Sequence, residues 1–170
     1  MTKFILDATT LLPLSKNKPQ QAIVLCHGYG GNGKDISLLA SNWQRFLPNA
    51  IFLCPNAPEI CSVSQQGFQW FDLTSENEEV ILEKSLIAEE KLNTFLNQIF
   101  DNFQLKPINL ALVGFSQGCM MCIQVGIKKR EQINCLIGYS GKIINQTHLS
   151  KNINSKPKIF LMHGENDTIV

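Results

Sequence analysis

The sequence has little charge and few of the features that mark a specialised class of protein. Asp, Glu, Lys and Arg make up 17% of its 170 residues and the net charge is +1, so the composition gives no reason to expect a nucleic-acid partner. No apolar run approaches the ~20 residues that a membrane-spanning helix needs. Hydrophobic residues make up an ordinary 44%. We therefore expect a single globular domain over residues 1–170.

The sequence also lacks the features of a signal peptide. Its start, MTKFILDATTLLPL, carries Asp7 inside the apolar part, and no small-residue cleavage site follows. Without such a leader, the six cysteines are expected to be reduced, buried thiols of a cytoplasmic protein. Cys119 and Cys122 have the C-x-x-C spacing of a redox pair, but they fall in a predicted helix and we interpret them as core residues.

Short apolar runs alternate with helical patterns along the chain. The apolar runs cover residues 21–26, 50–54, 108–114, 134–140 and 158–164. Helical spacing covers residues 35–47, 79–103 and 117–130. This alternation predicts an α/β fold with a mostly parallel sheet and helices on both of its faces. Chemistry in such folds lies beyond the carboxyl ends of the strands, so the loops after these runs are expected to share one edge.

The segment after the third of these runs has the pattern of a nucleophile elbow. Residues 114–118 read GFSQG, which is G-x-S-x-G between a predicted strand and a predicted helix. Small residues are needed on both sides of the strained serine, and Gly114 and Gly118 meet that need. Ser116 would also stand at a helix N-terminus, which favours developing negative charge. We predict that Ser116 is a nucleophile rather than a helix-capping serine.

Acyl transfer needs donors for an oxyanion and an acid that comes later in the chain. The elbow supplies the backbone N–H of Gln117, and the glycine-rich loop HGYG at 27–30 offers that of Tyr29. The acid follows the serine in the order serine, acid, histidine. Asp167 is the predicted acid, with Glu165 as the weaker alternative.

The glycine loop itself also fits two nucleotide-binding patterns. Gly28, Gly33 and Lys34 have the spacing of a P-loop, but Asp35 stands where a P-loop needs Ser or Thr. The dinucleotide pattern requires an acid near the end of the second strand, and no acid occurs there before Glu59. Both patterns therefore fail at a specific residue, and we predict no nucleotide, cofactor or metal.

Six segments resemble the carboxylesterase/phospholipase branch of the α/β-hydrolases, which includes acyl-protein thioesterases. They are HGYGGNGKD (27–35), PNAP (55–58), QWFDL (69–73), GFSQG (114–118), YSG (139–141) and HGENDTIV (163–170). The resemblance implies an α/β-hydrolase fold that acts on carboxylic esters or thioesters. It implies Ser116 as nucleophile, Asp167 as acid, and Tyr29 and Gln117 as oxyanion donors. It also suggests that Trp70 contacts the substrate.

One departure concerns the general base. The resemblance implies a histidine after Asp167, but the sequence has three histidines, His27, His148 and His163, and none holds that position. The chain is expected to be a C-terminally truncated hydrolase that lacks the last strand and helix, roughly 30–40 residues at typical element lengths. Residues 158–163 would then form an exposed sheet edge. The alternatives are an impaired serine hydrolase and an inactive remnant or binding module. Oligomeric state and acyl-chain preference stay open.

Overall fold

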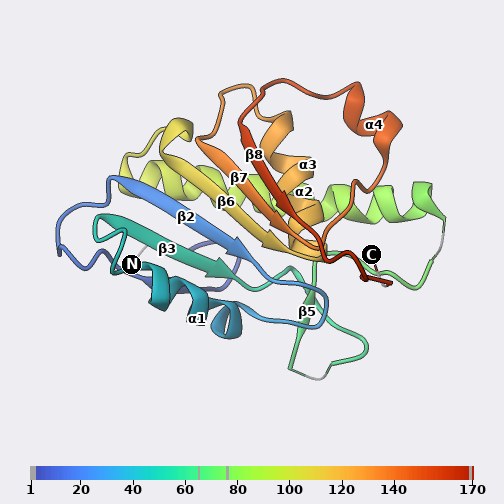
Figure 1. The fold of residues 1–170 in the computed structure, drawn as a ribbon, viewed down its shortest axis with the longest axis horizontal. Helices are drawn as coiled ribbons and strands as arrows, with labels where there is room; N and C mark the ends of the chain where they lie inside the picture. The colour runs from blue at the N-terminus through green and yellow to red at the C-terminus, as the bar shows by residue number, and fades with distance from the viewer. Residues whose placement is uncertain (1–2, 65, 76, 169) are drawn as a thin grey trace.

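A six-stranded, mostly parallel sheet forms the centre of the protein (Figure 1). The computed structural model describes residues 3–64, 66–75, 77–168 and 170, so Ile169 of the HGENDTIV segment lies outside the described residues. The strand order is β1-β3-β2-β6-β7-β8, and only β1 runs antiparallel to its neighbour. The strands are β1 (Ala8–Leu11), β2 (Gln21–Cys26), β3 (Ala50–Pro55), β6 (Leu110–Phe115), β7 (Cys135–Tyr139) and β8 (Lys158–Met162). The predicted α/β class and all five predicted strands are confirmed.

The central strands are apolar on both sides because helices cover both faces of the sheet. Val24 of β2 pairs with Leu112 of β6 and with Leu53 of β3, and all three are buried. Val24 belongs to the core beneath one set of helices, whereas its neighbours Ile23 and Leu25 belong to the core on the other face. The period of two along β2 thus divides its side chains between two cores.

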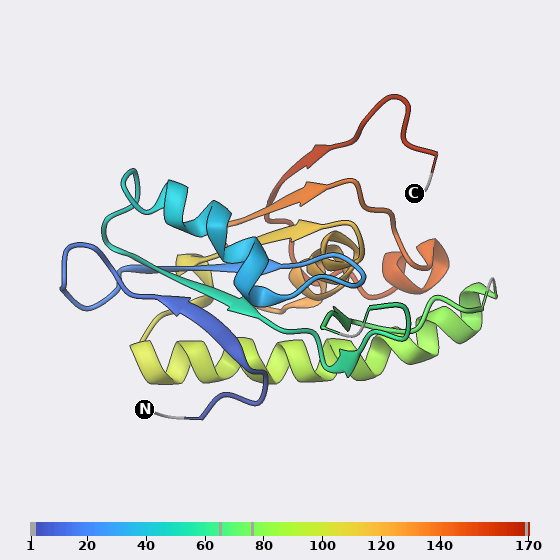
Figure 2. The same ribbon diagram turned by 90° about the horizontal axis from the view of Figure 1, so that it is seen from below.

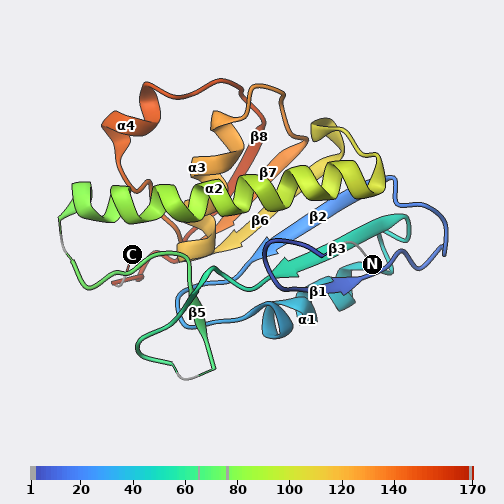
Figure 3. The same ribbon diagram turned by 180° about the vertical axis from the view of Figure 1, so that it is seen from behind.

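The helices form two layers around the sheet, as Figures 2 and 3 show. Helix α1 (Gly33–Trp43) packs on β1, β2 and β3 from one face. Helix α3 (Gln117–Lys128) packs on β2, β6 and β7 from the other, and the long helix α2 (Glu78–Phe103) lies over α3. A short helix, α4 (Gln146–Ser150), and a 3₁₀ turn, η1 (Pro107–Asn109), complete the helical segments. None of the helices within the described ranges combines the length and apolarity that crossing a bilayer requires.

Local capping sets the helix ends. The Asn32 side chain accepts a hydrogen bond from the Asp35 N–H, so α1 begins two residues before the predicted start. Helix α2 ends at Phe103, and its C-cap residue Gln104 has a φ of 56°, which takes the chain into the left-handed region. The predicted helix 35–47 is too long, because α1 ends at Trp43 and the chain turns toward Pro48.

Short elements account for most of what the sequence pattern missed. Strand β1 pairs with β3 at the sheet edge, and the two-residue strands β4 (Glu59–Ile60) and β5 (Phe68–Gln69) form a hairpin in a segment predicted to be irregular. Elements of two to four residues carry too little periodicity to be recognised. The cysteines agree better with expectation: all six are free, five are buried, and Cys135 is half-buried.

Strand β8 forms the far edge of the sheet, as expected, and exposes its apolar side chains. The exposed fractions are 47% for Ile159, 61% for Phe160, 59% for Leu161 and 38% for Met162. Phe160 pairs with Ile137 of β7, which packs in the core on the α1 face, so Phe160 lies on that same face. Among the described residues α1 reaches β1, β2 and β3 but not β8. Apolar side chains are therefore exposed on both faces of the sheet at this edge.

Replacing Phe160 by lysine should remove much of this apolar surface without unfolding the chain. We expect Phe160→Lys to lower the binding of a hydrophobic dye, with a change in the free energy of unfolding within about 0.5 kcal/mol. Ile108→Lys is the matched control, since Ile108 is 51% exposed but lies in η1, away from the β8 edge. Dye fluorescence and thermal denaturation measure both effects. An equal drop in both variants would show that the β8 edge is not the dye-binding surface.

Candidate active site

The carboxyl ends of the parallel strands lie together at one edge of the sheet (Figure 1). Cys26 at the end of β2 is in register with Gly114 of β6, and Phe115 of β6 is in register with Tyr139 of β7. The glycine loop after β2 and the GFSQG turn after β6 are therefore neighbours. This confirms the expected shared edge for these loops.

Ser116 occupies a strained turn between β6 and α3. Its φ of 50° and ψ of −118° are rare for a residue with a side chain, and it is the N-cap residue of α3. The Ser116 N–H donates to the Tyr139 carbonyl at 2.8 Å, which anchors the turn to β7. A Cβ on Gly114 would collide with the Cys119 backbone, and one on Gly118 would collide with the Cys26 carbonyl. Both glycines are thus required by backbone contact.

The glycine loop after β2 lies directly against Ser116. A Cβ built on Gly28 would stand 3.3 Å from the Ser116 Cβ and 3.0 Å from a ring carbon of Phe115. Within the part of the chain that the structure describes, neither the Tyr29 N–H nor the Gln117 N–H donates to a protein acceptor. Two backbone amides on adjoining loops next to the serine are therefore left without an acceptor among the described residues.

The His27 side chain holds the peptide that carries the Tyr29 N–H. Its Nε2 accepts a hydrogen bond from the Ala57 N–H at 2.9 Å, so the proton must be on Nδ1. Nδ1 then donates to the Gly28 carbonyl at 2.7 Å. Burial lowers the pKa of His27, and the Gly28 hydrogen bond and the Asp35 charge only partly oppose this effect. His27 is a neutral structural group with both ring nitrogens occupied, rather than a base for Ser116.

The hydrogen bonds between the Gln117 side chain and the Trp70 loop are the part of the site that sequence reasoning missed. Gln117 Oε1 accepts from the Trp70 N–H at 2.8 Å, and Gln117 Nε2 donates to the Phe71 carbonyl at 2.6 Å. The Trp70 indole N–H donates to the His27 carbonyl at 2.9 Å. The family resemblance suggested Trp70 as a substrate contact, whereas the structure buries its side chain completely. The QWFDL and GFSQG segments were both noticed, but nothing in either showed that they bond to each other.

The predicted acid lies beyond β8 in contact with a histidine. His163 Nε2 lies 3.3 Å from Asp167 Oδ2, and Asp167 Oδ1 accepts from the Val170 N–H at 3.1 Å. Glu165 is exposed. His148 lies in α4, 3.4 Å from the Lys128 ammonium group. Among the described residues no histidine hydrogen-bonds to Ser116, and none of their His, Cys, Asp or Glu side chains cluster in a group that would hold a metal.

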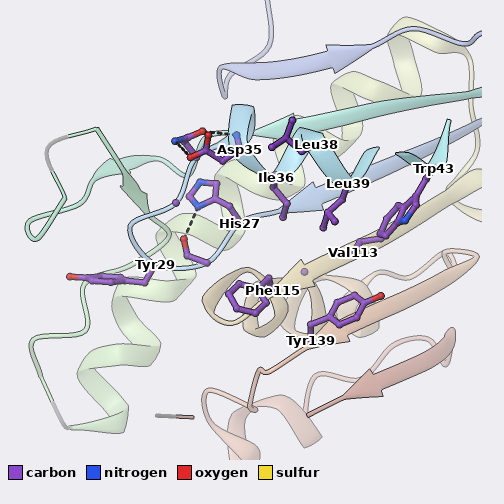
Figure 4. A pocket seen from close by; sticks show the side chains of 14 residues that line it. His27, Tyr29, Asp35, Ile36, Leu38, Leu39, Trp43, Val113, Phe115 and Tyr139 are labelled. Carbon is purple, nitrogen blue, oxygen red and sulfur yellow. Dashed lines mark hydrogen bonds between the residues drawn. The ribbon is translucent and has the colours of Figure 1, made fainter. Parts of the chain in front are cut away.

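An apolar groove of about 600 Å³ begins at the glycine loop and runs between α1 and the sheet (Figure 4). Gly28 and Tyr29 border one end of it. Its walls are largely hydrophobic side chains that α1 and the strands contribute from opposite sides, namely Ile36, Leu39, Trp43, Val113, Phe115 and Tyr139. A ligand bound at Ser116 would have an apolar surface next to it.

The contact of Gly118 with β2 generates a stability prediction. Alanine in place of glycine inside a helix usually stabilises by about 1 kcal/mol. Gly118→Ala should instead lower the free energy of unfolding by about 2 kcal/mol or more, because its Cβ would meet the Cys26 and His27 carbonyl groups, which cannot rotate away. Gly164→Ala is the control, since its Cβ would approach only the Asp167 Cβ, at 4.0 Å. Chemical denaturation of both variants distinguishes this account from a general glycine effect.

The lowered pKa of His27 generates a pH prediction. The unfolded chain takes up a proton on this residue near pH 6.5, but the folded chain takes it up only at lower pH. The contribution of His27 to stability should therefore decline as the pH falls from about 7.5 to about 5.5. His27→Asn should show a shallower decline over the same range, whatever its absolute stability. If the free energy of unfolding fell equally steeply with pH in the wild type and in His27→Asn, this result would contradict a buried, neutral His27.

The chain is similar to several characterised proteins along most of its length. Acyl-protein thioesterase 1 of Emericella nidulans is 28% identical over 182 residues, which cover 96% of this chain and 75% of that protein. The Aspergillus fumigatus protein of the same name is 29% identical, and the match covers 73% of that protein.

Solved structures agree with this similarity. The crystal structure of esterase PE8 superposes with a TM-score of 0.91 at 34% identity, covering 97% of this chain and 77% of that one. The Bacillus cereus carboxylesterase superposes with a TM-score of 0.73 at 18% identity, covering 97% of this chain and 73% of that one, and supports the fold alone. Residues 12–170 match the sequence model of the phospholipase/carboxylesterase family. The chain therefore belongs to the phospholipase/carboxylesterase family of α/β-hydrolases, and it is a hydrolase by family.

Proposed function

We propose that this protein is a serine hydrolase that cleaves carboxylic esters or thioesters through an acyl-enzyme on Ser116. The observation that carries the proposal is the pairing of the strained Ser116 turn with the backbone amides of Tyr29 and Gln117, for which the described residues supply no acceptor. A nucleophile and oxyanion donors on adjoining loops are the arrangement that acyl transfer requires.

The reaction would proceed in two steps. A base takes the Ser116 hydroxyl proton while Oγ attacks the acyl carbonyl, and the Tyr29 and Gln117 N–H groups donate to the oxyanion. The tetrahedral intermediate expels an alcohol or a thiol, which takes up the proton. Water then attacks the acyl-enzyme, which releases the carboxylic acid and restores the serine. The N-terminus of α3 at Ser116 favours the negative charge of the tetrahedral intermediates that form during acylation and deacylation.

The apolar groove supports an acyl group as the part of the substrate that lies beside Ser116. Its walls are mainly hydrophobic, and Gly28, Tyr29 and Phe115 border it next to the serine turn. The relatives that are named acyl-protein thioesterases suggest acyl thioesters as one substrate class. We propose that a fatty acyl chain lies along this groove and the ester or thioester carbonyl lies at Ser116.

None of the three histidines is placed to act as the general base for Ser116 among the described residues. His27 has both nitrogens bonded and a lowered pKa, His148 lies by Lys128, and His163 contacts Asp167. We propose that the chain acylates slowly, since loss of a triad member can cost on the order of 10⁶ in turnover. The same observation favours a second function, a binding module that holds an acyl compound in the groove without cleaving it.

Turnover of p-nitrophenyl acetate, with and without added imidazole, distinguishes these functions. We expect slow hydrolysis that imidazole accelerates by about tenfold or more beyond its own background, because it can act as the missing base. Ser116→Ala should abolish this acceleration, and mass spectrometry should find a fluorophosphonate adduct on Ser116.

Ser140→Ala is the matched control, since Ser140 also has a positive φ at the same sheet edge but follows β7. It should retain the imidazole-dependent rate. Fast Ser116-dependent turnover without imidazole would refute the proposal that the chain lacks a general base. Acyl-ligand binding without any Ser116-dependent chemistry would favour the binding module.

A further inference from the structure

Trp70 joins the two loops that carry the proposed oxyanion donors. Its backbone N–H donates to the Gln117 side chain, and its indole N–H donates to the His27 carbonyl. Gln117 is one of the two donor residues, and His27 lies two residues before the other, Tyr29. One buried residue is therefore hydrogen-bonded to both halves of the proposed oxyanion site.

The bonds around Trp70 control the orientation of particular peptide groups. The His27 carbonyl, held by the indole, belongs to the His27–Gly28 peptide. The next peptide, Gly28–Tyr29, contains both the Gly28 carbonyl that accepts from His27 Nδ1 and the Tyr29 N–H that would bind the oxyanion. Fixing these two successive peptides fixes the direction of the Tyr29 N–H.

The Gln117 side chain is held by the loop that contains Trp70. Its side-chain amide accepts from the Trp70 N–H and donates to the Phe71 carbonyl, so the side chain cannot rotate without breaking both bonds. The loop is tied to α2 one residue later, where Asp72 forms an ion pair with Lys84 at 2.6 Å. Trp70 thus connects the donors to a loop that is itself anchored.

Burial makes these hydrogen bonds costly to lose. Trp70 and Gln117 are 0% exposed and His27 is 3% exposed. A buried polar group that loses its partner keeps the full cost of its desolvation, so each bond strongly favours one geometry. The Trp70 and His27 rings also lie against each other, with centroids 5.9 Å apart.

From this network we propose that Trp70 is a positioning residue for the oxyanion site, acting through His27 and Gln117 rather than by contact with substrate. The inference rests on the proposed serine hydrolase. Oxyanion donors act only when they lie about 2.7–3.1 Å from the developing charge. A small reorientation of the Tyr29 peptide therefore reduces the stabilisation of the transition state more than it reduces the binding of the substrate.

The test compares Trp70→Phe, which removes the indole N–H and keeps an aromatic ring, with Phe95→Leu. Phe95 is a fully buried residue of α2 outside the site, so its variant reports the effect of lost packing alone. With imidazole present, Trp70→Phe should lower kcat for p-nitrophenyl acetate by about 10- to 100-fold with KM within about twofold. Phe95→Leu should leave both constants unchanged under conditions where it is folded.

A second readout does not depend on turnover. The backbone amide signals of Tyr29 and Gln117 in ¹⁵N-labelled protein should shift in Trp70→Phe but not in Phe95→Leu. Unchanged amides, or an unchanged kcat in an active protein, would overturn the positioning role. A wild-type chain with no Ser116-dependent turnover would instead overturn the proposed hydrolase, while the amide signals would still decide whether Trp70 orients the two loops.

Discussion

The candidate site depends on one close backbone contact, between Gly118 at the start of α3 and the carbonyl groups of Cys26 and His27 at the end of β2. No side chain fits between them. The N-terminus of α3 can therefore approach β2 closely enough for the Ser116 turn to touch the glycine loop at Gly28. The strained φ of Ser116 follows from the same arrangement, because the chain must turn sharply from β6 into a helix that begins so near the sheet.

Fixed dipoles are the groups at this edge that would stabilise a negative charge beside Ser116. The N-terminus of α3 and the backbone amides of Tyr29 and Gln117 supply partial positive charge where an oxyanion would form. His27 stays neutral because it is buried, which suits its role as an acceptor for the Ala57 N–H. Preorganised groups of this kind need no rearrangement during reaction, provided that their surroundings hold them rigidly.

The sequence was informative wherever a residue's role depends on its neighbours along the chain. The five parallel strands follow from apolar runs, and the positions of Gly114 and Gly118 follow from the needs of the turn. It was uninformative about contacts between distant segments. Nothing in the local pattern shows that the Gln117 amide reaches Trp70, 47 residues away, or that His27 accepts from Ala57, 30 residues away. The expectation that Trp70 contacts a substrate came from the resemblance of the QWFDL segment to the family, and that resemblance does not show how tertiary packing buries the side chain.

The most direct test of the account is a crystal structure of the protein with an alkyl phosphonate bound covalently to Ser116. The adduct imitates the tetrahedral intermediate, so its phosphoryl oxygen should lie about 2.7–3.1 Å from both the Tyr29 and the Gln117 backbone nitrogens. Its alkyl chain should lie in the groove between α1 and the sheet. A phosphoryl oxygen that faces solvent, or that bonds to neither amide, would contradict the assignment of the two loops as an oxyanion site.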